Sequence, residues 1–275
     1  MKSVTTLLIA AASASLLFGV FGMSETAAKT PESTDAQASV MRTVLSGDWR
    51  TEQAVRDVFR HPEATLAFFG LAPGLNVVEI APGGAGWYTN ILAPYSKATG
   101  GTFTAADVSD RFKKTFGDTQ IYGKVHTADF GGESEPFATA SADLVLTFRS
   151  VHGWIGRGYD EKAFADFYTA LKPGGILGVV EHRLPESVGK DMQGGYVTVS
   201  HVKALAKAAG FEFVGASEIN ANEKDTADHP FGVWTLPPTS RSANRGQETA
   251  ADFDAAKYKA IGESDRFTLK FRKPE

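Results

Sequence analysis

The sequence predicts an α/β fold in which a mostly parallel, doubly wound sheet of seven strands is covered by helices on both faces. Two observations predict it. Apolar runs of strand length alternate along the chain with segments of helical periodicity, and a glycine-rich turn directly follows the first of these runs. Parallel strands require crossover connections, so this alternation places helices on both faces of the sheet. A chain of 275 residues that is 43% hydrophobic can bury one core of this size.

The first strand is expected over 75–80, an apolar run that follows the turn at 72–74. A helix precedes this turn, with Pro62 in its first turn and Gly70 as its stop. Six further apolar segments predict the remaining strands, at 102–106, 124–127, 144–148, 176–180, 212–217 and 266–271.

Two helices between these strands are marked by apolar residues at the spacing i, i+3, i+4 and i+7. One follows an expected cap at Asp160 and carries Phe164, Phe167, Tyr168 and Leu171. The other lies between Ser200 and Gly210. Both connect successive strands, as crossover helices do.

The N-terminus has the order of a secretory signal, with Lys2 before an apolar run over 4–23 and small residues after it. We expect residues 1–28 to be a signal peptide, 29–45 a linker, and the mature protein to be periplasmic or secreted, without stable membrane insertion after cleavage. An uncleaved membrane anchor is the alternative, because about twenty apolar residues can span a bilayer.

The remaining chain, 46–275, predicts one domain. Helices over 46–70 lead into it. A segment near 220–263, rich in Pro, Asn, Ser and Asp, is too long for a hairpin turn and is expected to be a partly ordered insertion over one edge of the site.

Composition excludes several classes of function. The formal net charge of −4 gives no electrostatic reason to expect a nucleic-acid partner. The absence of cysteine excludes disulfides, thiolate nucleophiles and cysteine-ligated zinc. The oligomeric state stays open.

The strongest chemical signal is the stretch 77–87, a buried strand that runs into a glycine-rich turn and a helix start. Glycines at 83, 84 and 86 let the backbone approach a ligand and leave helical N–H groups free to point at it. Asp107 ends the second strand, where a carboxylate typically accepts hydrogen bonds from a ribose. This pair predicts a nucleoside-bearing cofactor.

Five motifs in order resemble those of class I S-adenosylmethionine-dependent methyltransferases: the acidic glycine loop, Asp107, and the stretches 128–130, 143–146 and 171–175. The resemblance covers about 71–271 and implies a Rossmann-like sheet with an antiparallel C-terminal strand. More narrowly, 148–154 and 231–238 are similar to stretches of exported bacterial proteins predicted to be methyltransferases.

The resemblance implies S-adenosylmethionine as the cofactor and assigns its contacts. Glu79 would orient the glycine loop or the methionine amino group, Asp107 would bind the ribose, Asp129 the adenine amino group, and Phe130 the adenine ring. The loop residues that would contact the methionine portion are Ala81, Gly83, Gly84 and Gly86. Ala81 and Ala85 depart from the family pattern, which prefers glycine there.

Methyl transfer requires an acceptor held in line with the methyl–sulfur bond, and a base only where the acceptor must lose a proton. We expect a small-molecule acceptor. The candidate catalytic residues are Arg149, His152 and His182, with His152 as the expected base because histidine titrates near neutrality. The other reading of His152 is a residue that caps or packs a loop.

No metal is expected, because neighbours on a strand, such as Glu181 and His182, point to opposite faces and do not easily converge on one ion.

Two other functions stay open at this point. An NAD(P)-dependent oxidoreductase would use the same crevice, although the first glycine of its fingerprint is replaced by Ala81. An exported, non-catalytic nucleoside-binding or interaction module could also retain this fold, since folds persist when functions change.

Overall fold

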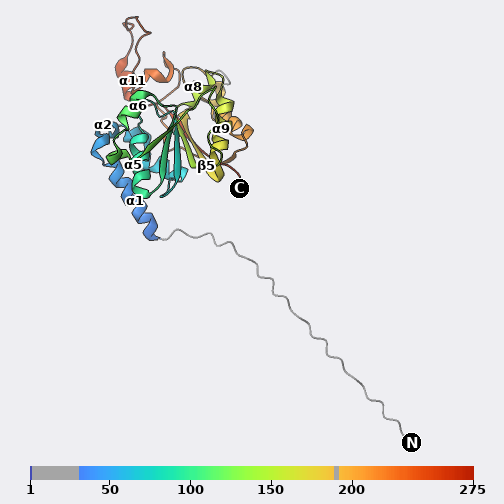
Figure 1. The fold of residues 1–275 in the computed structure, drawn as a ribbon. Coiled ribbons are helices and arrows are strands. Elements are labelled where there is room, and N and C mark those ends of the chain that lie inside the picture. The colour runs from blue at the N-terminus through green and yellow to red at the C-terminus, as the bar shows by residue number, and fades with distance from the viewer. Residues whose placement is uncertain (2–30, 189–191) are drawn as a thin grey trace.

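The computed structural model describes Met1 and residues 31–188 and 192–275. The predicted signal peptide, residues 1–28, lies outside these residues except for Met1. Among the helices in the described ranges, none has both the length and the apolar character needed to cross a membrane. A central sheet with helices packed around it forms the body of the protein (Figure 1).

The sheet has seven strands in the order β3-β2-β1-β4-β5-β7-β6. Strands β1 to β5 run parallel to one another, and β7 is antiparallel to both β5 and β6. This confirms the predicted mostly parallel sheet with an antiparallel C-terminal strand. The strands are β1 (Asn76–Ile80), β2 (Thr102–Ala106), β3 (Val125–Ala128), β4 (Ala142–Phe148), β5 (Leu171–His182), β6 (Glu212–Ser217) and β7 (Arg266–Arg272).

Helices cover both faces of the sheet, as the alternation predicts. On β4, Leu144 and Leu146 belong to one hydrophobic cluster and Val145 to the other, because successive strand residues point to opposite faces. The first cluster is covered by α1 (Pro31–Leu45), α4 (Pro62–Phe69), α5 (Thr89–Thr99), α6 (Asp110–Thr115) and α7 (Thr119–Tyr122), and the second by α8 (Val151–Ile155), α9 (Asp160–Ala170) and α10 (Val199–Ala208).

Residues 31–45 form helix α1, where the sequence predicted a linker over 29–45. Met41 and Val44 are buried in the cluster that also contains α5, and α1 contacts α5 directly. Burial of these two side chains stabilises a helix that composition alone did not indicate. The short helices α2 (Thr51–Ala54) and α3 (Asp57–Arg60) lie between α1 and α4.

Helix ends agree with the sequence at α4 and differ at α9. Pro62 occupies the first turn of α4, and Gly70 ends it at φ 87°. Asp160 is the first residue of α9 rather than its cap, and Tyr159 precedes it without a side-chain capping bond. The Asp160 carboxylate instead lies 3.2 Å from Nε2 of His201, which joins α9 to α10.

The segment 220–263 is mostly irregular and contains one α-helix, α11 (Ala255–Ile261). Asp225 anchors it. The fully buried carboxylate of Asp225 accepts a hydrogen bond from Tyr196 Oη at 3.0 Å and lies 2.8 Å from Nε2 of His229. It also accepts from the backbone N–H of Asp265 at 2.8 Å. These contacts fix the insertion against the start of β7.

Candidate functional site

A cavity of about 270 Å³ opens at the carboxyl ends of β1, β4 and β5. In an open α/β sheet this edge is where ligands bind. Four parts of the chain line the cavity: the end of β1 with the loop after it, the turn after β4 with α8, the end of β5, and the insertion. The insertion contributes 233–234, 237–239 and 263 to the lining.

The glycine loop has backbone conformations that favour glycine. Gly83 has φ 69°, and a Cβ added there would meet nothing within 4 Å, so its exposed backbone faces open space. Gly86 has φ 47°, and a Cβ there would come within 2.4 Å of Phe116. Ala81 and Gly83 line the cavity, whereas Gly84 and Gly86 are outside its lining. Gly83 thus permits ligand approach, and Gly86 permits close packing.

Ala81 adopts φ 52° without being glycine, which stores backbone strain at the cavity wall. Its N–H donates to the carbonyl of Ala106 at 2.9 Å, so the first loop residue continues the pairing of β1 with β2.

Glu79 is 2% exposed and lines the cavity. Its carboxyl group accepts a hydrogen bond from Thr89 Oγ1 at 2.6 Å, which joins β1 to the first residue of α5 across the glycine loop. Burial raises the pKa of Glu79 to about 8, although the Thr89 hydrogen bond and Arg149 oppose this rise. The role of Glu79 in orienting the glycine loop stays a prediction.

Asp107 and Asp129 lie at the ends of neighbouring strands, on the same edge of the sheet as the glycine loop. Asp107 follows the pair Ile80–Ala106 in the register of β1 and β2, and its N–H donates to the carbonyl of Ala128. Both carboxylates are exposed and lie outside the cavity lining, on the β2 and β3 side of it. The topology thus aligns the three predicted cofactor contacts along one edge.

Phe130 does not reach the cavity. It is 8% exposed and stacks against Phe137 and Phe167 in the hydrophobic core. The structure therefore places it as a core residue rather than as part of the cavity wall.

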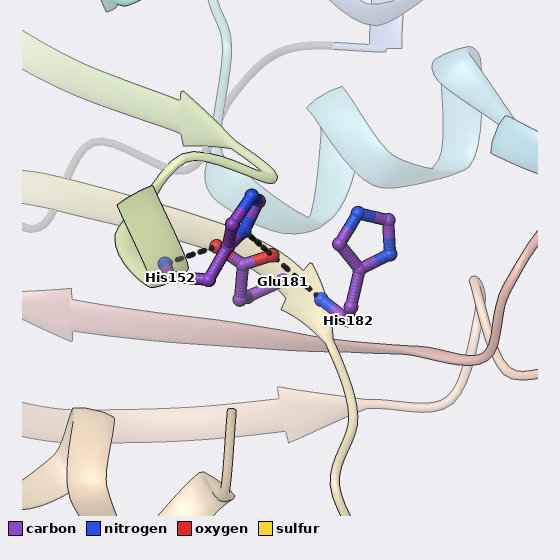
Figure 2. A group of neighbouring side chains, drawn as sticks. All are labelled: His152, Glu181 and His182. Atoms are coloured by element: carbon purple, nitrogen blue, oxygen red, sulfur yellow. Dashed lines mark hydrogen bonds and ion pairs between the residues drawn. The ribbon is translucent and has the colours of Figure 1, made fainter. Parts of the chain in front are cut away.

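The central feature of the site is a histidine–carboxylate pair, His152 and Glu181 (Figure 2). His152 Nδ1 lies 3.2 Å from Oε1 of Glu181, and the His152 backbone N–H donates to Oε2 at 3.3 Å. Glu181 is fully buried at the end of β5, and His152 is 21% exposed on α8 and lines the cavity. A hydrogen on Nδ1 that points at Glu181 leaves Nε2 with the lone pair of a base.

The environment of His152 shifts its affinity for a proton. Burial lowers the pKa of the imidazole, but the charge of Glu181 and its hydrogen bond outweigh burial and raise the pKa above 6.5. The predicted base is therefore oriented and made more basic by Glu181. Sequence reasoning did not assign this role to Glu181, because the pairing joins residues that are 29 positions apart.

His182 has a different state. Its imidazole is 7% exposed, lies 5.6 Å from that of His152, and places Nδ1 2.5 Å from Oγ of Ser264. Burial lowers the pKa of His182 well below 6.5, and Arg149 and His152 lower it further. His182 is therefore a neutral hydrogen-bonding group at physiological pH.

The expectation that Glu181 and His182 do not converge is wrong. His152, Glu181 and His182 place one potential ligand atom each within 4.8 Å of one another. The carboxylate of Glu181 turns back along the strand and accepts the N–H of His182 at 2.8 Å, so strand alternation does not separate the groups. Three of these hydrogen bonds already occupy Glu181, and the nearby guanidinium groups oppose a divalent cation. We interpret His152 and Glu181 as a pair that accepts a proton, with the neutral imidazole of His182 beside it.

Arg149 also reaches the cavity, in the turn after β4, with φ 62°. Glu263, at the end of the insertion, lines the cavity beside it and pairs with Arg56, Arg60 and Arg266. Sequence reasoning predicted Arg149 but missed Glu263 and its three arginine partners. The ion pair between Arg60 and Glu263 joins residues 203 positions apart, and no local pattern indicates such a contact.

Comparison with known proteins finds a methyltransferase domain in this chain. Residues 78–179 match the family model of the methyltransferase domain. The chain is 31% identical over 127 residues to the ubiquinone/menaquinone biosynthesis C-methyltransferase UbiE of Psychromonas ingrahamii, a match that covers 44% of this chain and 48% of that protein. The chain thus aligns with about half the length of this curated relative.

Solved structures share the fold at low identity. The [4+2]-cyclase SpnF has a TM-score of 0.56 at 15% identity, and the match covers 86% of this chain and 96% of that one. A protein described as a putative sarcosine dimethylglycine methyltransferase from Galdieria sulphuraria has a TM-score of 0.53 at 12% identity, with coverages of 80% and 85%. These similarities concern the fold alone.

Proposed function

We propose that this chain, which belongs to the class I S-adenosylmethionine-dependent methyltransferases, transfers the methyl group of that cofactor to a small acceptor bound in the cavity. The observation that carries the proposal is the placement of His152, paired with the buried Glu181, in the same cavity as Ala81 and Gly83 of the glycine loop. The open backbone at Gly83, the carboxyl group of Glu79 and the exposed carboxylate of Asp107 fit the methionine and ribose portions of the cofactor.

The cofactor, when bound, supplies a methyl group already activated by a sulfonium, so the protein has mainly to position the acceptor. His152 Nε2 would accept the proton that an acceptor hydroxyl, amine or thiol loses. The lone pair of the acceptor would form the bond to the methyl carbon as the methyl–sulfur bond breaks, which leaves the sulfur as a neutral thioether. Glu181 holds the imidazole in the required orientation and stabilises the imidazolium that results.

The walls of the cavity fit a small and partly apolar acceptor. Phe148 stacks on Tyr88 with ring centroids 3.5 Å apart, and the ring of Trp234 lies 6.0 Å from that of His152. These aromatic side chains would exclude water from the reacting atoms.

We also propose that the protein acts outside the cytosol, in the periplasm or after secretion. The charged start, the apolar run over 4–23 and the small residues after it support this proposal. Mass spectrometry of the purified protein, which locates its N-terminus, tests this proposal. Cleavage near residue 28 is expected, and a protein that keeps Lys2 and is found in the membrane fraction would contradict it.

Calorimetric titration with S-adenosylhomocysteine tests the cofactor site. We expect the protein to bind it, and Asp107→Ala to weaken binding by about tenfold or more, since a charge-assisted hydrogen bond contributes about 1.5–3 kcal/mol. The matched control is Asp252→Ala, which removes an exposed carboxylate of the insertion. Equal affinities for the protein and Asp107→Ala would overturn the assignment.

Transfer is tested by release of S-adenosylhomocysteine from S-adenosylmethionine in the presence of phenol, thiol, amine and carboxylate probes, with His152→Gln as the variant. Cofactor binding with no release for any probe would instead support the non-catalytic module. Binding of NAD(P) in place of S-adenosylhomocysteine would support the oxidoreductase.

A further inference from the structure

Four guanidinium groups gather beside the cavity around one carboxylate. This arginine cluster consists of Arg56, Arg60, Arg149 and Arg266, and the carboxylate is Glu263. Glu263 is 4% exposed, and its two oxygens accept from Arg56 Nε at 2.6 Å and Arg60 Nε at 3.0 Å. Arg266 Nη1 lies 3.2 Å from the same carboxylate. Glu263 thus forms ion pairs with three arginines.

The cluster holds buried donors without acceptors. Arg60 is fully buried, yet Nη1 and Nη2 have no hydrogen-bond partner, and neither has Nη2 of Arg56. Arg60 lies over the ring of Trp87, 4.7 Å from its centroid, and Trp87 is part of the cavity wall. Unpaired buried donors cost free energy, so their retention indicates that another group neutralises them in the functional state.

Arg149 is the member of the cluster that lines the cavity. Within residues 31–188 and 192–275, no ion pair or hydrogen bond of its guanidinium is found. Its backbone adopts φ 62°, which is unfavourable for a residue with a long side chain. A strained backbone that presents an unpaired cation to a cavity is typical of a ligand contact rather than of a structural residue.

Two carboxyl groups line the cavity together with Arg149, those of Glu79 and Glu263, and the ion pairs of Glu263 are with other arginines. Burial raises the pKa of Glu79 to about 8, so this carboxyl group is mostly protonated at neutral pH. Burial also lowers the pKa of Arg149 to about 10, with Arg266 contributing, and that of Arg60 to about 8, with Arg149 contributing. The charge of Glu263 opposes the fall in the pKa of Arg149, but one carboxylate among four guanidinium groups leaves the cluster with a net positive charge.

We propose that the acceptor is an anion, and that Arg149, supported by Arg60, binds its carboxylate or phosphate group while the aromatic walls hold its apolar body. Guanidinium groups bind both anions through paired hydrogen bonds. The inference rests on the proposed methyl transfer, because the bound anion is taken to be the methyl acceptor. A carboxylate could also come from the methionine part of the cofactor, and the experiment below separates the two sources.

Benzoate is the probe and benzamide its neutral counterpart of the same shape. With S-adenosylhomocysteine at saturation, we expect benzoate to bind at least about tenfold more tightly than benzamide, since an ion-paired hydrogen bond contributes about 1.5 kcal/mol or more. Arg149→Gln should abolish this preference and Arg149→Lys should restore part of it. Arg157→Gln is the matched control, because Arg157 is exposed and donates to Gly153.

The cofactor is titrated separately. If Arg149 binds the acceptor, Arg149→Gln leaves the affinity for S-adenosylhomocysteine within about threefold of the original. Weakened binding of S-adenosylhomocysteine with unchanged binding of 5′-methylthioadenosine, which lacks the carboxylate, would assign Arg149 to the cofactor and overturn the proposal. Equal binding of benzoate and benzamide would also overturn it.

Two further outcomes keep the proposals separable. If S-adenosylhomocysteine does not bind, the proposed function fails, and the benzoate titration without cofactor still tests the anion site. The unfolding temperature of Arg149→Gln should equal or exceed that of the unmodified protein, because the variant removes an unpaired cation. A large fall would reveal a structural partner for Arg149 and overturn the proposal.

Discussion

The Nδ1 atom of His152 lies 3.2 Å from Oε1 of Glu181, and this contact joins α8 to the carboxyl end of β5. Glu181 is fully buried, so its charge acts on His152 with little screening by water. The pair gives one imidazole in the cavity a fixed orientation and an increased affinity for a proton.

Glu181→Gln should lower the pKa of His152 below 6.5, because the amide removes the charge that offsets burial. In the unmodified protein the pair contributes stability that is fully present below pH 6.5 and is lost as the pH rises through the raised pKa of His152. NMR titration of the histidine ring signals measures the shift.

The matched control for this titration is Asp160→Asn, which removes the carboxylate partner of His201 at the same 3.2 Å distance but away from the cavity. It should leave the titration of His152 unchanged. An unchanged pKa of His152 in Glu181→Gln would contradict the pairing.

Glu79→Gln should remove a pH dependence of stability. Unfolded Glu79 releases its proton near 4.5, whereas folded Glu79 keeps it up to about 8, so this group destabilises the fold as the pH rises between these values. The slope is at most about 1.4 kcal/mol per pH unit. Denaturant unfolding at pH 5, 6.5 and 8 should show the variant gaining stability relative to the unmodified protein as the pH rises.

Glu63→Gln, which changes an exposed glutamate of α4, is the control and should leave the pH dependence as it was. A constant difference between Glu79→Gln and the unmodified protein across this range would mean that Glu79 is ionised in the folded state.

Gly83→Ala should weaken the binding of S-adenosylhomocysteine, whereas Gly74→Ala should leave the affinity unchanged. Gly83 has φ 69° with open space around a Cβ, and Gly74 has φ 77° with equally open space but lies in an exposed turn outside the cavity. Alanine at either position costs about 1 kcal/mol of backbone strain. Calorimetry should find weaker binding for Gly83→Ala alone, and similar losses of affinity in both variants would show that Gly83 does not contact the cofactor.

Asp225→Ala should lower the free energy of unfolding by about 3 kcal/mol, because it leaves the buried hydroxyl of Tyr196 and the imidazole of His229 without their acceptor. Denaturant unfolding measures the loss. Asp228→Ala removes an exposed carboxylate three positions along the same segment and should cost less than about 0.5 kcal/mol. Equal losses in the two variants would exclude Asp225 as the anchor of the insertion.

The sequence alone determined the architecture and the edge of the sheet at which the site lies. Strand and helix periodicities are local, and parallel connectivity follows from their alternation, so all seven strands were predicted near their observed positions. The glycine turn, Glu79 and Asp107 could be recognised because each lies at or directly after the end of a strand. Helix α1 was missed because its stability comes from burial of Met41 and Val44 against α5, which composition does not reveal.

Only the tertiary structure decided which charges meet. The pairing of His152 with Glu181, the neutral state of His182 and the gathering of arginines around Glu263 join residues 29 to 207 positions apart. Burial then sets the pKa of each group, and burial depends on the complete packing of the chain rather than on any local stretch. The sequence therefore located the glycine loop, whereas the folded chain created the His152–Glu181 pair and brought Arg149 to the cavity wall.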